Sequence, residues 1–178
     1  MEQLNKKVDK IFNNGSIPPI YGNNFSKGNL SWKRIDGIEF ENIGRILICH
    51  LLIETHLNKL IELQMPKGFD IDAANLTFSQ KLKMLQPNHI FKKVNFHKGI
   101  TTINKIRNKF SHNIEAFMDH QDVEAIKLFL IDYDNKNIKD QKVENDYNNY
   151  SNLAIIEDFT SLFCAYCAGY CSAIVEKW

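Results

Sequence analysis

The side chains best suited to chemistry in this chain stand close together as Arg107, Asn108 and His112. A guanidinium is always charged and can hold a phosphate through two parallel hydrogen bonds. An imidazole can take up or release a proton near neutral pH. Cleaving a phosphodiester without a metal needs both functions, so this group indicates chemistry on RNA.

Each of the three residues has a role in such a reaction. The 2′-hydroxyl of a ribose would attack the adjacent phosphate, with His112 as acid or base, and leave a 2′,3′-cyclic phosphate and a 5′-hydroxyl. Arg107 would stabilise the charge on the phosphorane oxygens, and Asn108 would orient His112 or the phosphate. Taken alone, the group fits better a polar cluster that caps the end of a core helix, so the context has to decide.

The spacing of Arg107 and His112, with the polar Asn108 after the arginine, resembles the Arg-x4-6-His motif of the HEPN superfamily, whose members are small all-helical proteins. Three further segments resemble the family's motif helix, its long first core helix and the short helix between them: 102–115, 43–61 and 76–85. The likeness covers roughly residues 36 to 130 and is nearest to the mannitol-repressor-like branch. With it, the catalytic interpretation is favoured over the capping cluster.

The resemblance implies a metal-independent endoribonuclease, such as a toxin or an antiphage defence effector. On a regular helix Arg107 and His112 lie about 140° apart. In the family two motif helices border a dimer cleft that both side chains can reach, so we expect a homodimer whose motif helices face each other. Two alternatives stay open, namely a non-catalytic regulatory or binding protein resembling the mannitol operon repressor, and a helical subunit whose motif only organises the dimer.

A polar stripe on the first core helix bears on the same site. His50, Glu54 and Asn58 follow one another at helical spacing, so one side of that helix faces water, a partner or the site. The family often keeps an acidic residue at the position of Glu54, which makes Glu54 and His50 supporting residues that would orient the site. A solvated helix face with an i, i+4 pair explains the stripe equally well.

The formal net charge of +1 hides an uneven distribution along the chain. No acidic residue lies between Asp72 and Glu115, whereas seven lysines, three histidines and Arg107 do. Such a segment suits a polyanion, although solvated helix faces would give the same pattern. We expect five lysines of the segment to bind RNA: Lys92, Lys93, Lys98, Lys105 and Lys109. Because the chain has only 3 arginines against 19 lysines, Arg107 is less readily explained as a general surface charge.

Ile114, two positions after the histidine, bears on possible partners. HEPN toxins paired with nucleotidyltransferase antitoxins often carry a tyrosine there, and the antitoxin modifies its hydroxyl. Isoleucine has no hydroxyl, so an antitoxin or defence partner of this chain would have to cover the site or act elsewhere.

The sequence predicts neither a metal nor another cofactor, since it has no H-E-x-x-H spacing and no Gly-rich phosphate loop. Cys164, Cys167 and Cys171 fall on one face of an apolar helix among small residues, which favours close packing over metal binding. The four cysteines do not form the ladder of a disulfide-rich secreted domain. No leader or bilayer-spanning segment is predicted, so we expect a cytoplasmic protein without membrane contact.

The length of 178 residues and a hydrophobic content of 44% predict a single domain over 1–178. We expect an all-α bundle of about five to six helices with an irregular N-terminal arm. Its parts are an N-terminal helix and arm, a core with the motif helix, a polar loop and a closing helix: 1–35, 36–130, 132–151 and 153–178. The N-terminal part divides into a helix over 4–12 and the arm over 13–33.

The core should contain four helices: 37–63, 76–85, 96–118 and 122–131. Thr77 is a start signal for the second of these helices, and Pro87 closes it. The third should bury one stripe of apolar residues at helical spacing: Ile100, Ile103, Ile106, Phe110, Ile114 and Phe117.

Overall fold

The structure is a computed structural model that describes residues 20–26, 29–35, 40–86, 91, 94–113, 116–137, 147 and 149–175. The chain divides into two compact units, Met1–Ile38 and Glu39–Trp178. The second unit contains every predicted site residue that the structure describes.

The first unit contains an antiparallel pair of strands, β1 (Ile20–Ser26) and β2 (Asn29–Ile35). The register runs from Ile20 opposite Ile35 to Ser26 opposite Asn29. The prediction of an irregular arm was therefore wrong for these residues. Two residues separate the strands, a length typical of β-hairpins, and this connection was the missed sequence signal. The predicted helix over 4–12 lies outside the described residues.

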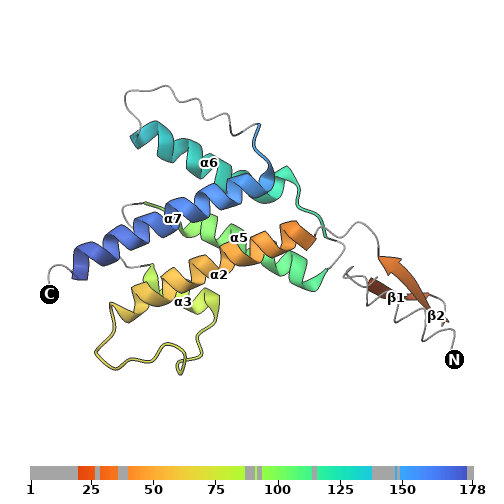
Figure 1. Cartoon of the computed structure of the whole chain (residues 1–178), viewed down its shortest axis with the longest axis horizontal. Coiled ribbons are helices and arrows are strands. Elements are labelled where there is room, and N and C mark those ends of the chain that lie inside the picture. Colours follow the sequence, from red (N-terminus) through yellow and green to blue (C-terminus); the bar gives the residue numbers. More distant parts are fainter. Residues whose placement is uncertain are drawn as a thin grey trace, which may run out of the picture. The chain divides into compact units, whose positions relative to one another are not determined.

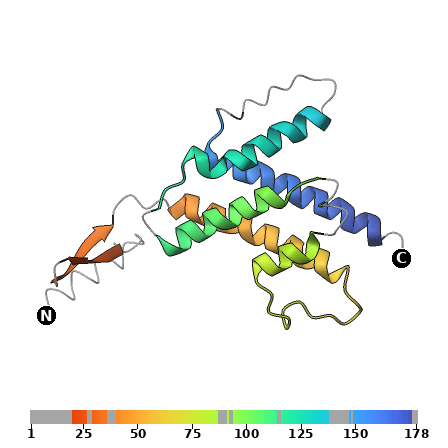
Figure 2. The ribbon, with the colours of Figure 1, turned by 180° about the vertical axis from the view of Figure 1, so that it is seen from behind.

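Within the described residues, the second unit has five helices: α2 (Phe40–Glu62), α3 (Phe78–Leu85), α5 (His97–His112), α6 (His120–Asn137) and α7 (Asn152–Val175). The prediction of an all-α bundle is confirmed for this unit. Helix α2 packs against α3, α5 and α7, while α6 packs against α5 and α7. Figures 1 and 2 show α6 on one side of the bundle and α3 on the other, with α2, α5 and α7 between them. None of the helices in this described part combines the length and the apolar character needed to cross a membrane.

The start of α3 confirms the signal at Thr77. The Thr77 hydroxyl accepts a hydrogen bond from the Gln80 backbone N–H at 3.3 Å, and the Thr77 backbone N–H donates to the Gln80 side chain at 2.8 Å. This reciprocal capping satisfies two backbone donors that would otherwise lack partners. Leu82 and Leu85 then bury the inner face of the short helix against the core.

Phe96, directly before α5, lies at the centre of an aromatic cluster and is fully buried. The centroid of its ring lies 5.3 Å from those of Phe129 in α6 and Phe163 in α7. The rings of Phe159 and Tyr166 in α7 follow at 6.0 and 5.4 Å. These separations suit tilted and edge-to-face aromatic pairs, so the cluster fixes where α5 begins.

Gly99 lets α5 approach α7 closely. A Cβ at this position would come within 2.3 Å of the ring of Phe159, which is itself fully buried. A side chain here would force the ring to move within a packed core. The missing side chain thus helps to set the depth of α5 in the bundle, and with it the position of the polar residues further along the helix.

Helix α5 ends at His112, six residues before the predicted end. Asn113 leaves the helix with φ −144° and ψ 105°, and Phe117 is 68% exposed, so its predicted place in the buried stripe was wrong. A new start signal explains the early end, because Asp119 and Asp122 bond each other's backbone N–H groups at 3.0 Å and cap α6.

The predicted polar loop over 132–151 was wrong for its first six residues, since α6 continues to Asn137. An i, i+4 ion pair of 2.6 Å between Lys136 and Asp132 stabilises this polar last turn. The loop residues 138–146 lie outside the described residues.

The predicted closing helix corresponds to α7, and its cysteines are free thiols. Cys167 is fully buried, while Cys164 and Cys171 are half-buried. Burial raises the pKa of the Cys164 thiol to about 11 and shifts the pKa of Cys167 in the same direction. Three of the cysteines therefore pack as small apolar side chains along one helix.

Candidate functional site

Helix α5 places Arg107 at the edge of its buried face. The face itself consists of apolar side chains and one glycine: Gly99, Ile100, Ile103, Ile106 and Phe110. Arg107 follows Ile106 directly and is half-buried. The arginine therefore lies where the core gives way to the polar side of the helix.

Arg107 has few partners for a half-buried guanidinium. Its Nη1 donates a hydrogen bond to Oδ1 of Asn108 at 3.0 Å. Its Nε is buried and has no hydrogen-bond partner, and no carboxylate in the described part of the chain forms an ion pair with it. A guanidinium has five N–H donors, so most of its capacity for binding an anion is unused.

His112 is the last residue of α5 and is exposed. Among the described residues no hydrogen bond joins it to Arg107 or Asn108. Asn108 stands one turn before His112 on the same face, and the bond to Asn108 draws the guanidinium toward that face. The structure thus orders the three predicted residues as Arg107, Asn108, His112 across α5, with one direct contact among them.

His50 of α2 contacts α5 one turn before Arg107. It is only 5% exposed, and its Nε2–H donates a hydrogen bond to Oδ1 of Asn104 at 3.1 Å. Its ring stacks on that of Phe78, with the two ring centroids 4.4 Å apart. Burial lowers the pKa of His50, and the positive charge of Arg107 acts in the same direction, whereas the bond to Asn104 and the charge of Glu54 oppose the shift. Burial thus favours the neutral form of His50, whose bond to Asn104 ties α2 to α5.

Glu54 forms an ion pair of 2.7 Å with Lys81 of α3. The Lys81 side chain is 10% exposed and the Glu54 side chain 27%, so this pair is partly shielded from solvent. One turn along α2 from His50, it links α2 to α3. The two residues expected to support the site, His50 and Glu54, thus lie together at the junction of α2, α3 and α5, on the Arg107 side of α5.

Asn104 belongs to this junction and was missed by sequence reasoning. It stands three residues before Arg107, and its bond to His50, 54 residues away in the sequence, joins α5 to α2. The available signal was a polar residue at i−3 from Arg107, beside the apolar stripe. Spacing along one helix cannot predict which side chain of another helix it will meet.

The lysines expected to bind RNA fall into three groups. Lys98 and Lys105 are exposed on α5, seven residues apart, and His112 follows after another seven. Seven residues make nearly two full turns, so these three lie almost in line, about 10 Å apart along the helix. We call them the α5 strip. Lys109 instead forms an ion pair of 2.6 Å with Asp122, and Lys92 and Lys93 lie outside the described residues.

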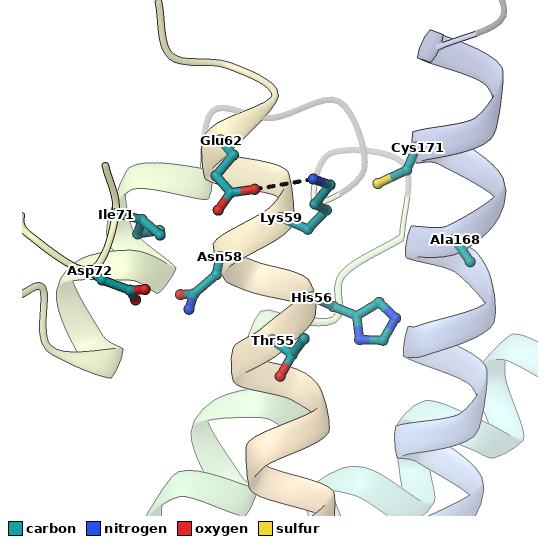
Figure 3. A pocket seen from close by; sticks show the side chains of 9 residues that line it. All are labelled: Thr55, His56, Asn58, Lys59, Glu62, Ile71, Asp72, Ala168 and Cys171. Atoms are coloured by element: carbon teal, nitrogen blue, oxygen red, sulfur yellow. Dashed lines mark hydrogen bonds and ion pairs between the residues drawn. The ribbon is translucent and has the colours of Figure 1, made fainter. Parts of the chain in front are cut away.

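A separate cavity of about 410 Å³ lies over the second half of α2, between the segment after α2 and α7 (Figure 3). Its polar lining includes His56, Asn58 and the Lys59–Glu62 ion pair of 3.2 Å, which Figure 3 marks with a dashed line. None of the predicted site residues lines it. Elsewhere among the described residues, no three His, Cys, Asp or Glu side chains group as a metal site would require.

No family model, no curated protein and no solved structure matches this chain. The likeness to the HEPN superfamily accordingly stands on the residues and their spacing.

Proposed function

We propose that the chain is a metal-independent endoribonuclease of the HEPN type, acting on RNA by attack of the 2′-hydroxyl on the adjacent phosphate. The observation that carries this proposal is Arg107, a half-buried guanidinium without a carboxylate partner among the described residues. Leaving such a group without an anion is costly, and a phosphate would supply the missing acceptors.

Helix α5 also carries cations that suit a nucleic acid backbone. The α5 strip offers two exposed lysines on the far side of the helix from Arg107, about 160° to 180° around it, and exposed His112 at the end of that strip could exchange protons with bound RNA and with solvent. Asn108 would hold the guanidinium in place while a phosphate binds its other N–H groups. Unpaired RNA is the better substrate, because a flexible backbone can bring the 2′-hydroxyl in line with the leaving oxygen.

The proposal includes a homodimer and a role as a toxin or antiphage effector, both drawn from the family resemblance. One copy offers one Arg107 and one His112, which stand far apart around α5. A cleft between two copies would bring two of each to the same RNA strand.

A second candidate is an RNA-binding protein that does not cleave. It is favoured by one observation, namely that no described residue holds His112 against Arg107. Under this alternative the guanidinium and the α5 strip would bind phosphates without any proton transfer.

Incubating the protein with single-stranded RNA in the presence of a chelator tests the proposal. We expect cleavage that leaves a 2′,3′-cyclic phosphate, and at least about a 100-fold loss of rate in His112→Ala and in Arg107→Ala. His120→Ala, at an exposed histidine of α6, is the matched control and should cleave as the wild type does. Undiminished cleavage by His112→Ala, or a need for added metal, would contradict the mechanism. Binding without cleavage by the wild type would favour the second candidate.

A further inference from the structure

The first half of α2 exposes a row of large apolar side chains. They are between 38% and 59% exposed: Phe40, Leu47, Ile48, Leu51 and Leu52. Their positions fall within about 140° of one another around the helix, so they share one side of α2, and Ile48 and Leu52 lie at the edge of this side toward α7. We call this row the α2 ridge.

The α2 ridge is a large apolar patch of the kind that often has a function. Its five side chains expose on the order of 500 Å² of apolar area, within the 300 to 600 Å² expected for the largest patch on a typical monomer. A stable protein interface takes about 800 Å² from each partner. The ridge alone would supply more than half of that area.

A hollow runs beside the ridge and would accept apolar side chains. It has a volume of about 300 Å³ and is lined by residues of α2 and α7: Arg45, Ile48, Cys49, Leu52, Glu157, Thr160 and Ser161. An exposed apolar row next to a hollow suits a two-fold axis, because each copy can then offer both halves of a self-complementary contact. Gly44 of α2 has no side chain, and a Cβ placed there would meet nothing within 4 Å. Another helix could therefore come close to the backbone at this position.

The charges around the ridge favour a protein partner over RNA. Positions 46–53 carry no lysine, arginine, aspartate or glutamate. The charges at either end are already paired within the chain, Arg45 with Glu157 at 2.7 Å and Glu54 with Lys81 at 2.7 Å. A neutral apolar face offers a phosphate backbone nothing, and two identical neutral faces do not repel each other.

We propose that a second copy of this chain covers the α2 ridge, with the two α2 helices crossing near Ile48 and Leu51. The inference rests on the exposed side chains and holds whether or not the protein cleaves RNA. It also refines the expected dimer, because the outward side of α5 carries the polar α5 strip and lacks a comparable apolar row. The two α5 helices would then border the interface, each with its Arg107 on the side toward α2.

Sedimentation of the full chain at micromolar concentration, with Leu51→Glu as the test variant, decides this proposal. We expect a dimer for the wild type and a monomer for Leu51→Glu, with the dissociation constant raised at least about 100-fold, because the dimer would bury an unpaired charge. Leu51 is 59% exposed, so the monomer should keep its circular dichroism and melting temperature. Leu128→Glu, at a 53% exposed leucine of α6, is the matched control and should remain a dimer.

A photo-crosslinking side chain at position 48 identifies what covers the ridge. A covalent dimer joined from one α2 to the other supports the proposal. A link within one chain to residues 1–38, a monomeric wild type, or a dimeric Leu51→Glu would overturn it. A dimer that cleaves no RNA would contradict the proposed ribonuclease while leaving the α2 interface intact.

Discussion

The two arginines of the helical unit have opposite surroundings. Arg45 of α2 donates two hydrogen bonds to Glu157, at 2.8 and 2.7 Å, and lies 3.5 Å from Glu41. The bond to Glu157 raises the pKa of Arg45. Arg107 of α5 is more enclosed, yet within the described residues its one hydrogen bond is to the amide of Asn108. Arg45 is thus satisfied within the fold and joins α2 to α7, whereas the Nε of Arg107 is buried without a hydrogen-bond partner in the part of the chain that the structure describes.

The lysines of the basic segment repeat this contrast. Lys81 and Lys109 are each held by a carboxylate of another helix, Glu54 and Asp122. Lys98 and Lys105 are exposed, and no ion pair holds them in the described part of the chain. Sequence spacing treats the four alike, but only those without a carboxylate partner can bind phosphate without first breaking an ion pair.

Giving Arg107 a carboxylate partner should make its surroundings resemble those of Arg45. Asn108→Asp should turn its hydrogen bond into an ion pair like that of Arg45, and the new negative charge should repel phosphate. We expect cleavage of RNA to fall about 100-fold, equivalent to about 2.7 kcal/mol, with the fold intact. Asn108→Ala is the control, since it removes the amide without adding charge. If the alanine variant loses as much activity as the aspartate variant, pairing of Arg107 is not the cause.

Removing lysine charges tests whether the exposed lysines contribute more to RNA binding than the paired one. Replacing Lys98 and Lys105 together by Gln should weaken binding of RNA about tenfold and reduce the dependence of affinity on salt. Lys109→Gln should have a smaller effect on binding, because its charge is already paired with Asp122. Fluorescence anisotropy at several salt concentrations measures both. Equal losses for the exposed and the paired lysines would show that the ion pair does not matter.

The smallest expected effect concerns the stability of the junction beside Arg107. The pKa of His50 in the folded chain lies below its ordinary value of 6.5, chiefly because the ring is buried. As pH falls below about 6.5 the unfolded chain binds a proton that the folded chain does not, so the free energy of unfolding falls and levels off below the folded pKa.

Urea unfolding of wild type and His50→Gln between about pH 7.5 and pH 5 measures this effect. The variant should keep the bond to Asn104, and its free energy of unfolding should fall less than that of the wild type as the pH is lowered. Identical pH profiles would mean that His50 is not the group responsible.

Local patterns in the sequence predicted the helical bundle well, because they act within a few residues. The hydroxyl of Thr77 and the side chain of Gln80 start α3 wherever the helix packs. The end of α5 was misplaced because Phe117 continued the apolar spacing, while the two aspartates at the start of α6 decided the boundary.

The candidate site could be predicted only in part, because it depends on contacts between distant helices. Arg107, Asn108 and His112 were found through their spacing. Three features depend on how α2, α3 and α5 pack. They are the bond between His50 and Asn104, the ion pair between Lys81 and Glu54, and the lack of a described carboxylate that pairs with Arg107. Helical periodicity predicts which residues share one face of a helix, but it does not predict which residues of other helices they contact.

In the proposed function Arg107 binds the phosphate of the RNA, whereas Arg45 forms a structural ion pair with Glu157. The most direct test is the affinity of both alanine variants for a 2′-O-methyl RNA oligonucleotide, which can bind but lacks the attacking hydroxyl. We expect Arg107→Ala to weaken binding about 10- to 100-fold, the loss of a charged hydrogen bond of about 1.5 to 3 kcal/mol, and Arg45→Ala to bind as the wild type does. Equal affinities for wild type and Arg107→Ala would contradict the proposed role of Arg107 in binding the phosphate.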